Sequence, residues 1–306
     1  MSVKQKIKKI SLWIGGIIAG LLIITSVLSY IYRDKIITFV TQELSSQLQG
    51  EIRIGKIDIS FLSSFPNVSI QLHNIIAKST PGFNTKEFNE YNTDTAFTAQ
   101  KLSFVFNVID FINERYIVQQ IKVKGAYINL FIDSKGKHNM NFVKETNDTV
   151  QTNYFIELSK ISIFKTHTHI HSAADKLYAH DYFDFAHISG KFLENGFSLF
   201  VDTEFKNHII SIDNQSFFPN LDIDTEISIA KTENLIQILK ASIATPLITI
   251  QTDGSVRLQN KSTETKLSYN FTIEDIEEFM SIMPQSIATM AKEHNLEGSI
   301  KANGTI

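Results

Sequence analysis

The sequence predicts a mainly β protein, in which an elongated antiparallel sheet follows one N-terminal transmembrane helix. Apolar and polar residues alternate along most of the chain, which is the period of a strand with one buried face. The apolar fraction is 43% and includes 23 Phe together with many Ile and Val, all of which favour strands. One uncharged run near the N-terminus is long enough to cross a bilayer.

Composition narrows the function classes. The chain has 306 residues, of which 20% are charged, and this balance excludes a disordered chain. Its net charge of −3 lacks the clustered positive charge that nucleic-acid binding demands. There is no cysteine, which excludes disulfides, thiolate metal sites and cysteine nucleophiles.

The N-terminus predicts a membrane anchor. Lysines at positions 4, 6, 8 and 9 precede an uncharged stretch from Leu12 to Tyr32, which spans about 30 Å as a helix. Trp13 at one end and Tyr30 and Tyr32 at the other suit the interfacial aromatic belts. A cleaved secretory signal is the alternative, but its apolar core is usually only about 7–15 residues long. The lysine excess places the N-terminus in the cytoplasm, so the remaining residues are exported.

The alternation changes parity at two glycines. Apolar positions over residues 52–54 resume in the opposite parity over 57–61 after Gly55, and those over 121–123 resume over 126–132 after Gly125. This pattern is typical of a β-bulge, because one extra residue would otherwise turn the apolar face outward. Further alternating runs cover residues 68–72, 102–106, 197–205, 221–229, 248–252, 256–258 and 267–273.

Two short amphipathic helices are expected between the strands. The first lies near Thr232–Ser242, where three apolar residues have helical spacing. The second lies near Ile273–Met283, with acidic residues in its first turn and Pro284 at its end.

One polar stretch predicts a boundary within the body. Residues 79–100 and 145–153 are typical of surface connections, and the second of them divides the body into two strand units. The chain then divides into a basic end and anchor (1–33), a first strand unit (34–145) and a second strand unit (146–306). A strand pattern over the last residues predicts that the second unit continues or pairs beyond Ile306.

Several segments after the anchor carry a family resemblance. They are Gly50–Ile59, Ser64–Ile70, Tyr116–Ile121 and Ile128–Asp133. Their order resembles the N-terminal region of the AsmA family. The Asp-x-x-Gly-x-x-Asn motif at Asp133, Gly136 and Asn139 is similar to that family's hairpin. The pattern from Glu274 through Pro284 to Gly298 resembles a helix-then-strand element common in its bacterial members.

The resemblance implies an inner-membrane protein whose periplasmic part forms a half-open, taco-like antiparallel β-groove, related to bridge-like lipid transfer proteins. Members act in outer-membrane biogenesis and in phospholipid movement across the periplasm. The family offers no catalytic residues to carry over, and no cofactor is implied.

Histidines form the most conspicuous local pattern. His167, His169 and His171 alternate along one strand, with His180 and His187 nearby. Three positions on one strand face spread over about 13 Å, too far for one tetrahedral zinc ion without another element. Whether these side chains face the interior depends on a bulge. No H-E-x-x-H, G-x-S-x-G or phosphate-binding loop is present, so the sequence predicts neither a metal site nor an enzyme.

The sequence thus favours a lipid-binding groove. We expect acyl chains to lie along an apolar sheet face that includes Ile128, Leu130, Ile132, Leu199, Val201 and Phe205. The partners are then phospholipid or another acyl-chain lipid, the membrane, and an envelope protein at either end. The alternative is a tethered scaffold that binds an assembly partner by adding strands to an open sheet edge.

Overall fold

The computed structural model describes residues 50–60, 67–107, 109–110, 113, 117–142, 160–193, 196–258 and 262–305. These residues form one large, elongated sheet with a few short helices, which confirms the mainly β fold predicted from the sequence. The predicted transmembrane segment, with Leu12, Trp13, Tyr30 and Tyr32, lies outside the described residues.

The sheet contains 13 strands. In chain order they are β1 (Ile52–Ser60), β2 (Asn67–Lys78), β3 (Thr95–Asn107), β4 (Val118–Ile132), β5 (Lys160–Ser172), β6 (Leu177–Leu193), β7 (Gly196–Ile212), β8 (Gln215–Phe217), β9 (Leu221–Thr232), β10 (Leu235–Ala244), β11 (Ile248–Leu258), β12 (Thr263–Ile273) and β13 (Ile300–Thr305). The short helices are η1 (Thr85–Phe88), α3 (Ile276–Ser281) and α4 (Gln285–Glu293).

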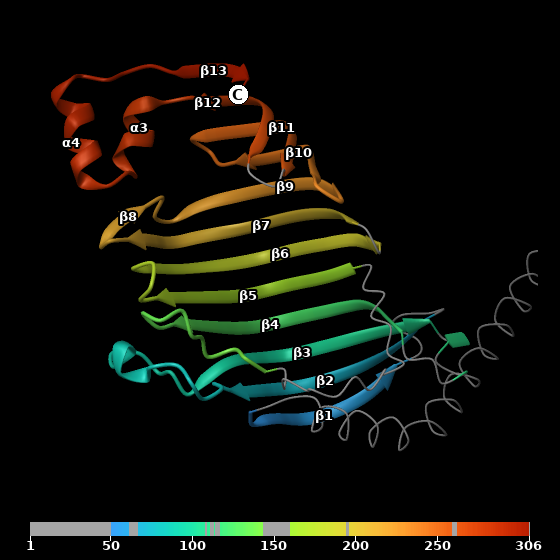
Figure 1. The fold of residues 1–306 in the computed structure, drawn as a ribbon. Coiled ribbons are helices and arrows are strands. Elements are labelled where there is room, and N and C mark those ends of the chain that lie inside the picture. Colours follow the sequence, from blue (N-terminus) through green and yellow to red (C-terminus); the bar gives the residue numbers. More distant parts are fainter. Residues whose placement is uncertain are drawn as a thin grey trace, which may run out of the picture.

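Strands that are neighbours in the sequence are neighbours in the sheet. The order runs from β1 to β7 and then from β9 to β13, with the short β8 paired to β7 (Figure 1). Every pair is antiparallel except β4 and β5, which are parallel. The predicted antiparallel sheet is therefore confirmed except at this step, which alternation could not reveal because it reports the face of a residue and not the direction of its strand. This pairing also joins the two predicted strand units into one sheet.

The strand ladders are interrupted at the same level in six neighbouring strands. The skipped residues, which we call the crease, are Gly55, Asn74, Gln100, Gly125, Lys165 and Asp184. Asn74, Gly125 and Lys165 have left-handed φ angles of 52°, 62° and 49°. Alternation changes parity across the crease, as predicted from the sequence at Gly55 and Gly125, and both of these predictions are confirmed.

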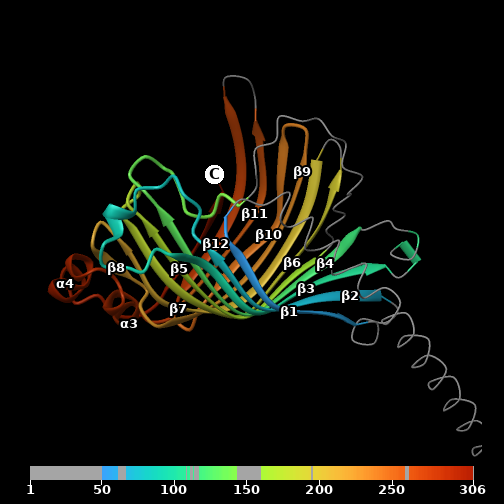
Figure 2. The same ribbon diagram turned by 90° about the horizontal axis from the view of Figure 1, so that it is seen from below.

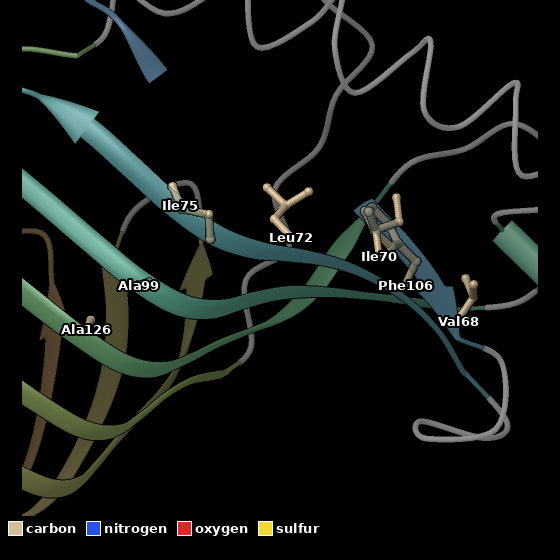
Figure 3. Packing of buried hydrophobic residues seen from close by; sticks show 7 residues of the cluster. All are labelled: Val68, Ile70, Leu72, Ile75, Ala99, Phe106 and Ala126. Atoms are coloured by element: carbon tan, nitrogen blue, oxygen red, sulfur yellow. The ribbon is translucent and has the colours of Figure 1, made fainter. Parts of the chain in front are cut away.

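The strands bend about their middle. Figure 2 shows the bend for the whole sheet, and Figure 3 shows that one cluster of apolar side chains lies on the side toward which the strands bend. We call this side the inner face and the opposite side the outer face. The cluster contains residues from both sides of the crease: Val68, Ile70, Leu72, Ile75, Ala99, Phe106 and Ala126. A parity change at the crease therefore keeps apolar residues on the inner face along the full length of these strands.

A second apolar cluster holds the helices against the end of the sheet. Ile276 and Phe279 of α3 pack against Leu221, Leu247 and Ile273. The Asp275 side chain accepts a hydrogen bond from the backbone N–H of Glu278 and caps α3. The predicted helix near Ile273–Met283 is thus real but shorter, since Ile273 ends β12. α3 ends before Pro284, as predicted, and Pro284 is the N-cap residue of α4, which follows directly.

The helix predicted near Thr232–Ser242 is wrong. Most of this segment is β10, which pairs with β9 and β11. Its ladder register shifts between Ile238 and Ala241, so two consecutive residues lie between apolar positions of one face. This irregularity places apolar residues at spacings that also fit a helix. The β-branched residues of the segment favour a strand, which is what the structure has.

The crease makes a testable demand on Gly125. A Cβ atom at this position would lie 2.5 Å from Cδ of Gln100, and its φ of 62° disfavours side chains. We expect Gly125→Ala to lower the free energy of unfolding by about 1–2 kcal/mol through backbone strain, because the exposed Gln100 side chain can move away from the added methyl group. Urea unfolding of the full chain in detergent measures this loss.

Gly136→Ala is the matched control. Gly136 also has a positive φ, 77°, but a Cβ there meets no atom within 4 Å. Its loss should be about 1 kcal/mol, from backbone strain alone. A Gly125→Ala chain as stable as the wild type would contradict the left-handed backbone at the crease.

Candidate functional site

The inner face is apolar across almost the whole sheet. Residues paired across neighbouring strands point to the same face, so the ladder register traces rows of side chains. One row crosses β1 to β7 and β9 to β13 through Ile59, Ile70, Phe104, Ile121, Ile161, Ile188, Val201, Ile227, Ala241, Thr252, Tyr269 and Gly304. From β1 to β10 every member of this row is apolar.

All the groove residues expected from the sequence lie on this inner face. They are Ile128, Leu130, Ile132, Leu199, Val201 and Phe205, and each is half-buried. Phe205 stacks on Phe183 of the neighbouring strand with 4.9 Å between ring centroids. The Asn129 and Asp202 side chains point to the outer face, one residue away in their strands. The structure thus brings together, on one surface, residues from two distant parts of the sequence.

The inner face is covered unequally along the sheet. Val68, at the β2 end, has no exposed surface. On β10 to β12 the inner-face residues Ile243, Ile250 and Tyr269 are 41%, 39% and 36% exposed, and Leu258 is also exposed. Ile243 pairs directly with Ile250, so part of this exposed surface is contiguous. Large apolar side chains that share one exposed face make this part of the sheet a candidate binding surface.

A second row of the inner face contains a polar interruption. This row crosses the strands on the other side of the crease through Ile52, Ala77, Phe97, Ile128, Thr168, Asp181, Asn207 and Leu221. Asp181 is only 9% exposed and Asn207 is fully buried. Burial raises the pKa of Asp181 to about 6, against the smaller opposing effects of His208 and of a hydrogen bond from Thr168.

The outer face of β7 and β9 is acidic. Asp202 lies opposite Glu226, and Glu204 lies opposite Asp224. Directly opposed like charges destabilise a sheet unless water screens them, so this surface is built to stay wet. A salt bridge from Lys240 to Glu226, with 2.5 Å between Nζ and Oε2, offsets part of the repulsion.

The Asp-x-x-Gly-x-x-Asn motif forms a hydrogen-bonded turn whose two ends, Asp133 and Asn139, are buried. Asp133 Oδ1 accepts from the N–H groups of Lys135 and Lys137, and Oδ2 accepts from the N–H of Asn84. Burial raises the pKa of Asp133, but these three donors outweigh it and hold the pKa below its ordinary value. Its role is therefore structural, because its oxygens are occupied by the backbone.

Asn139 completes the same turn. Its Oδ1 accepts from the N–H of Phe131 at 2.9 Å, and its Nδ2 donates to Asn129 O and Ser79 Oγ. The backbone oxygen of Asn139 also accepts from the N–H of Thr80. The motif thus ties the segment after β4 to the end of β2.

The three alternating histidines point to the outer face. Lys165, a residue of the crease, changes the parity of β5 between Ile163 and Thr166. His167, His169 and His171 therefore lie opposite to the apolar residues that precede them in the strand. From the sequence alone, the orientation of these histidines depends on a bulge, and the irregularity at Lys165 fills that role.

Histidines from three strands meet on this outer face. The His169 and His180 rings lie 4.1 Å apart, and those of His180 and His208 lie 4.6 Å apart. Burial lowers the pKa of His180 to about 4, with further lowering by its histidine neighbours. Among the described residues no group of three or more His, Asp or Glu has a geometry that holds a metal ion.

His171 belongs to an aromatic cluster at the end of the same surface. Its ring lies 4.0 Å from Tyr91, 5.0 Å from Phe131 and 4.7 Å from Tyr178, measured between centroids. Phe88 of η1 packs on Phe131 with a centroid distance of 5.1 Å. The segment that carries η1 thus covers this part of the outer face, and burial lowers the pKa of His171 to about 4.

Comparisons of the chain with protein-family models, with curated proteins and with solved structures found no match. Across the ranges that the structure describes, no helix combines the length and apolar character needed to cross a bilayer.

Three residues were not predicted from the sequence: Asp181 and Asn207 on the inner face, and His208 among the histidines of the outer face. Asp181 and Asn207 interrupt apolar alternation, and in a sequence such positions read as solvent-facing. His208 lies at a ladder irregularity of β7, which no glycine marks. A signal for the first two was their parity with Phe183 and Phe205, which places them on the apolar side.

The turn motif gives a stability prediction. Asn139→Ala removes three side-chain hydrogen bonds and leaves buried backbone groups of Phe131 and Asn129 without their partner, so we expect a loss of about 2–4 kcal/mol in the free energy of unfolding. Lys135→Ala, at an exposed position of the same turn, should change it by no more than about 0.5 kcal/mol. Similar unfolding midpoints for the two variants in urea would contradict the role of Asn139.

The aromatic cluster gives a pH prediction. The folded pKa of His171 is about 4, below the ordinary value of 6.5, so the unfolded chain takes up a proton first as pH falls. The stability that neutral His171 contributes is present above pH 6.5 and is lost as pH falls toward 4. We expect His171→Phe to lose less stability than the wild type between pH 7 and pH 4.5, measured by urea unfolding. His294→Phe, at an exposed position, should follow the wild type, and identical pH profiles for all three proteins would refute the prediction.

Proposed function

We propose that this chain is an AsmA-like, membrane-anchored protein that binds lipid acyl chains along the inner face of its sheet. It acts from the inner membrane, with the body in the periplasm, in phospholipid transport or outer-membrane assembly. The proposal makes it a binding and transfer protein and not an enzyme.

The observation that carries the proposal is the exposed apolar surface on β10 to β12. Ile243, Ile250, Leu258 and Tyr269 leave apolar area in contact with water on a single face. An acyl chain that covers this surface gains about 0.8 kcal/mol for each buried CH₂ group. A chain of ordinary lipid length therefore has enough contact to bind without a polar anchor.

The shape of the sheet supports an elongated ligand. The strands bend toward the apolar face (Figure 2), and the long row from Ile59 to Tyr269 runs across the strands. A flexible acyl chain can follow such a row, with its head group in water beyond the ends of the strands. The outer face of β7 and β9 carries opposed carboxylates, and Phe200 is the large apolar side chain exposed beside them among the described residues.

The family resemblance supports the cellular setting. The segment order after the predicted anchor and the Asp133, Gly136 and Asn139 motif are the features it shares with AsmA proteins. In the structure this motif is a hydrogen-bonded turn with Asp133 and Asn139 buried at its ends, which gives those residues a physical reason to occur together. The anchor and its orientation remain predictions from the sequence.

A tethered scaffold is the second candidate. In the part of the sheet that the structure describes, β13 lies at one edge and pairs with β12. An edge strand presents unpaired backbone groups, so another polypeptide can extend the sheet there. In that case a stoichiometric protein, and not phospholipid, should co-purify with the chain.

Crosslinking tests the lipid proposal directly. A photoreactive amino acid at Ile250, on the exposed inner face, should label phospholipid in membranes that contain the full chain. The same amino acid at Gln251, exposed on the outer face of the same strand, should give little or no lipid product. Mass spectrometry of the irradiated protein measures both products.

A charged variant separates lipid binding from folding. Ile250→Asp should remain folded, because an exposed charge stays hydrated, but it should lower lipid recovery at a second inner-face probe such as Val201. Gln251→Asp is the matched control and should leave that recovery unchanged. Equal labelling of the two faces, or unchanged labelling in Ile250→Asp, would exclude the lipid groove and favour the scaffold.

A further inference from the structure

The polar interruption of the inner face has uncharged neighbours within its own row. In its row, Thr168 of β5 and Leu221 of β9 flank Asp181 and Asn207. The inner-face positions next to Asp181 along β6 are Ala179 and Phe183. Asp181 is thus the only titratable side chain of this described row, and the charged group that acts on it from outside the row is His208.

Two acceptor oxygens meet here without a donor. Asp181 and Asn207 are direct partners in the β6–β7 ladder. The Oδ1 atoms of both residues are buried and lack a hydrogen-bond partner. The amide of Asn207 cannot simply turn around, because its Nδ2 donates to the backbone oxygen of Phe218 at 2.5 Å. Side chains opposed in this way have Cβ atoms about 4.5–5.5 Å apart, which one hydrogen bond can span.

We propose that Asp181 and Asn207 form a proton-operated contact between β6 and β7. When Asp181 is protonated, its carboxyl donates to Oδ1 of Asn207 and one proton satisfies both buried oxygens. When Asp181 is ionised, two acceptors face each other and the contact is repulsive. A proton suits this place better than a ligand, because both oxygens are closed to solvent.

The contact is connected to the helices at the end of the sheet. Asn207 holds Phe218 through its side-chain amide, and the N–H of Phe218 donates to the backbone oxygen of Ile282 at 3.1 Å. Ile282 directly follows α3, whose Phe279 packs near Phe218 with 6.2 Å between ring centroids. Loosening Asn207 therefore weakens the attachment of α3 and α4 to the strands.

The pH at which the contact changes follows from its surroundings. Burial raises the pKa of Asp181 to about 6 from 3.8, and the charge of His208, at the irregularity of β7, opposes this rise. The folded state therefore keeps a proton that the unfolded chain has already released. The stabilising contribution is complete below about pH 4 and is lost as pH rises through about 6. Since each pKa unit corresponds to a factor of ten, the folding equilibrium constant changes by up to about a hundredfold.

Asp181→Asn supplies the donor permanently, because its amide can donate to Asn207 at every pH. The experiment compares the full chain and this variant in detergent by urea unfolding between pH 4 and pH 7.5. We expect the wild type to lose stability relative to Asp181→Asn as pH rises, by at least tenfold in the folding equilibrium constant. Asp202→Asn, which removes an outer-face carboxylate, should follow the wild type.

Hydrogen exchange gives a second, local readout. After correction for intrinsic rates, the Phe218 amide of the wild type should exchange at least tenfold faster at pH 7.5 than at pH 5. In Asp181→Asn the corrected rate should be the same at both pH values. Parallel pH profiles for the wild type and Asp181→Asn, or an Asp181→Asn chain that fails to fold, would overturn the proposal.

A ligand donor is the competing explanation, and a lipid addition tests it. If phosphatidylethanolamine, with its amine, restores wild-type stability at pH 7.5 and phosphatidylcholine does not, a ligand supplies the missing donor and the proton contact is wrong. Equal responses to the two lipids, together with the pH profiles above, support the proton contact. Neither result depends on the crosslinking at Ile250, so the two proposals can fail separately.

Discussion

The fold depends on keeping apolar side chains on one face of long strands that bend. The bend is accompanied by local irregularities in the strands that form the crease. If the apolar pattern of the sequence did not change parity there, every later apolar side chain would turn to the opposite face. Here the irregularities occur at one level in β1 to β6, at the crease that includes Gly55, Gly125 and Lys165. Because neighbouring strands break together, their ladders resume in register and the inner face stays continuous.

Parts of the fold were readable in the sequence because glycine marks them. The changes of parity at Gly55 and Gly125 indicate two crease positions, and the alternating runs locate most strands. The crease at Asn74 and Lys165 uses ordinary residues with positive φ, which alternation alone does not reveal. The irregularity in β10 produced a false helix for the same reason. The parallel step between β4 and β5 was also unpredictable, since strand direction leaves no trace in face patterning.

The residues of the candidate site were also predictable only in part. The six expected groove residues share the inner face because parity transfers directly from sequence to sheet once each bulge is located. Asp181 and Asn207 escaped notice because a polar residue within a strand usually faces water. Only the ladder register, which aligns Asp181 with Asn207 and Leu221, shows that the polar pair belongs to an apolar row. Long-range pairing, and not local composition, decides the environment of these two side chains.

The two faces of the sheet place opposite requirements on what surrounds them. On the outer face, the opposed carboxylates Asp202 and Glu226 need water between and around them, so an apolar partner there would increase their repulsion. On the inner face, Ile243 and Ile250 gain from any apolar cover, and their exposure shows that the described chain does not provide it fully. A second packed sheet would need its own complementary side chains, whereas a fluid acyl chain adapts to the existing rows. This difference in adaptability, together with the bend toward the apolar side, is the physical reason to favour lipid over a folded partner on the inner face.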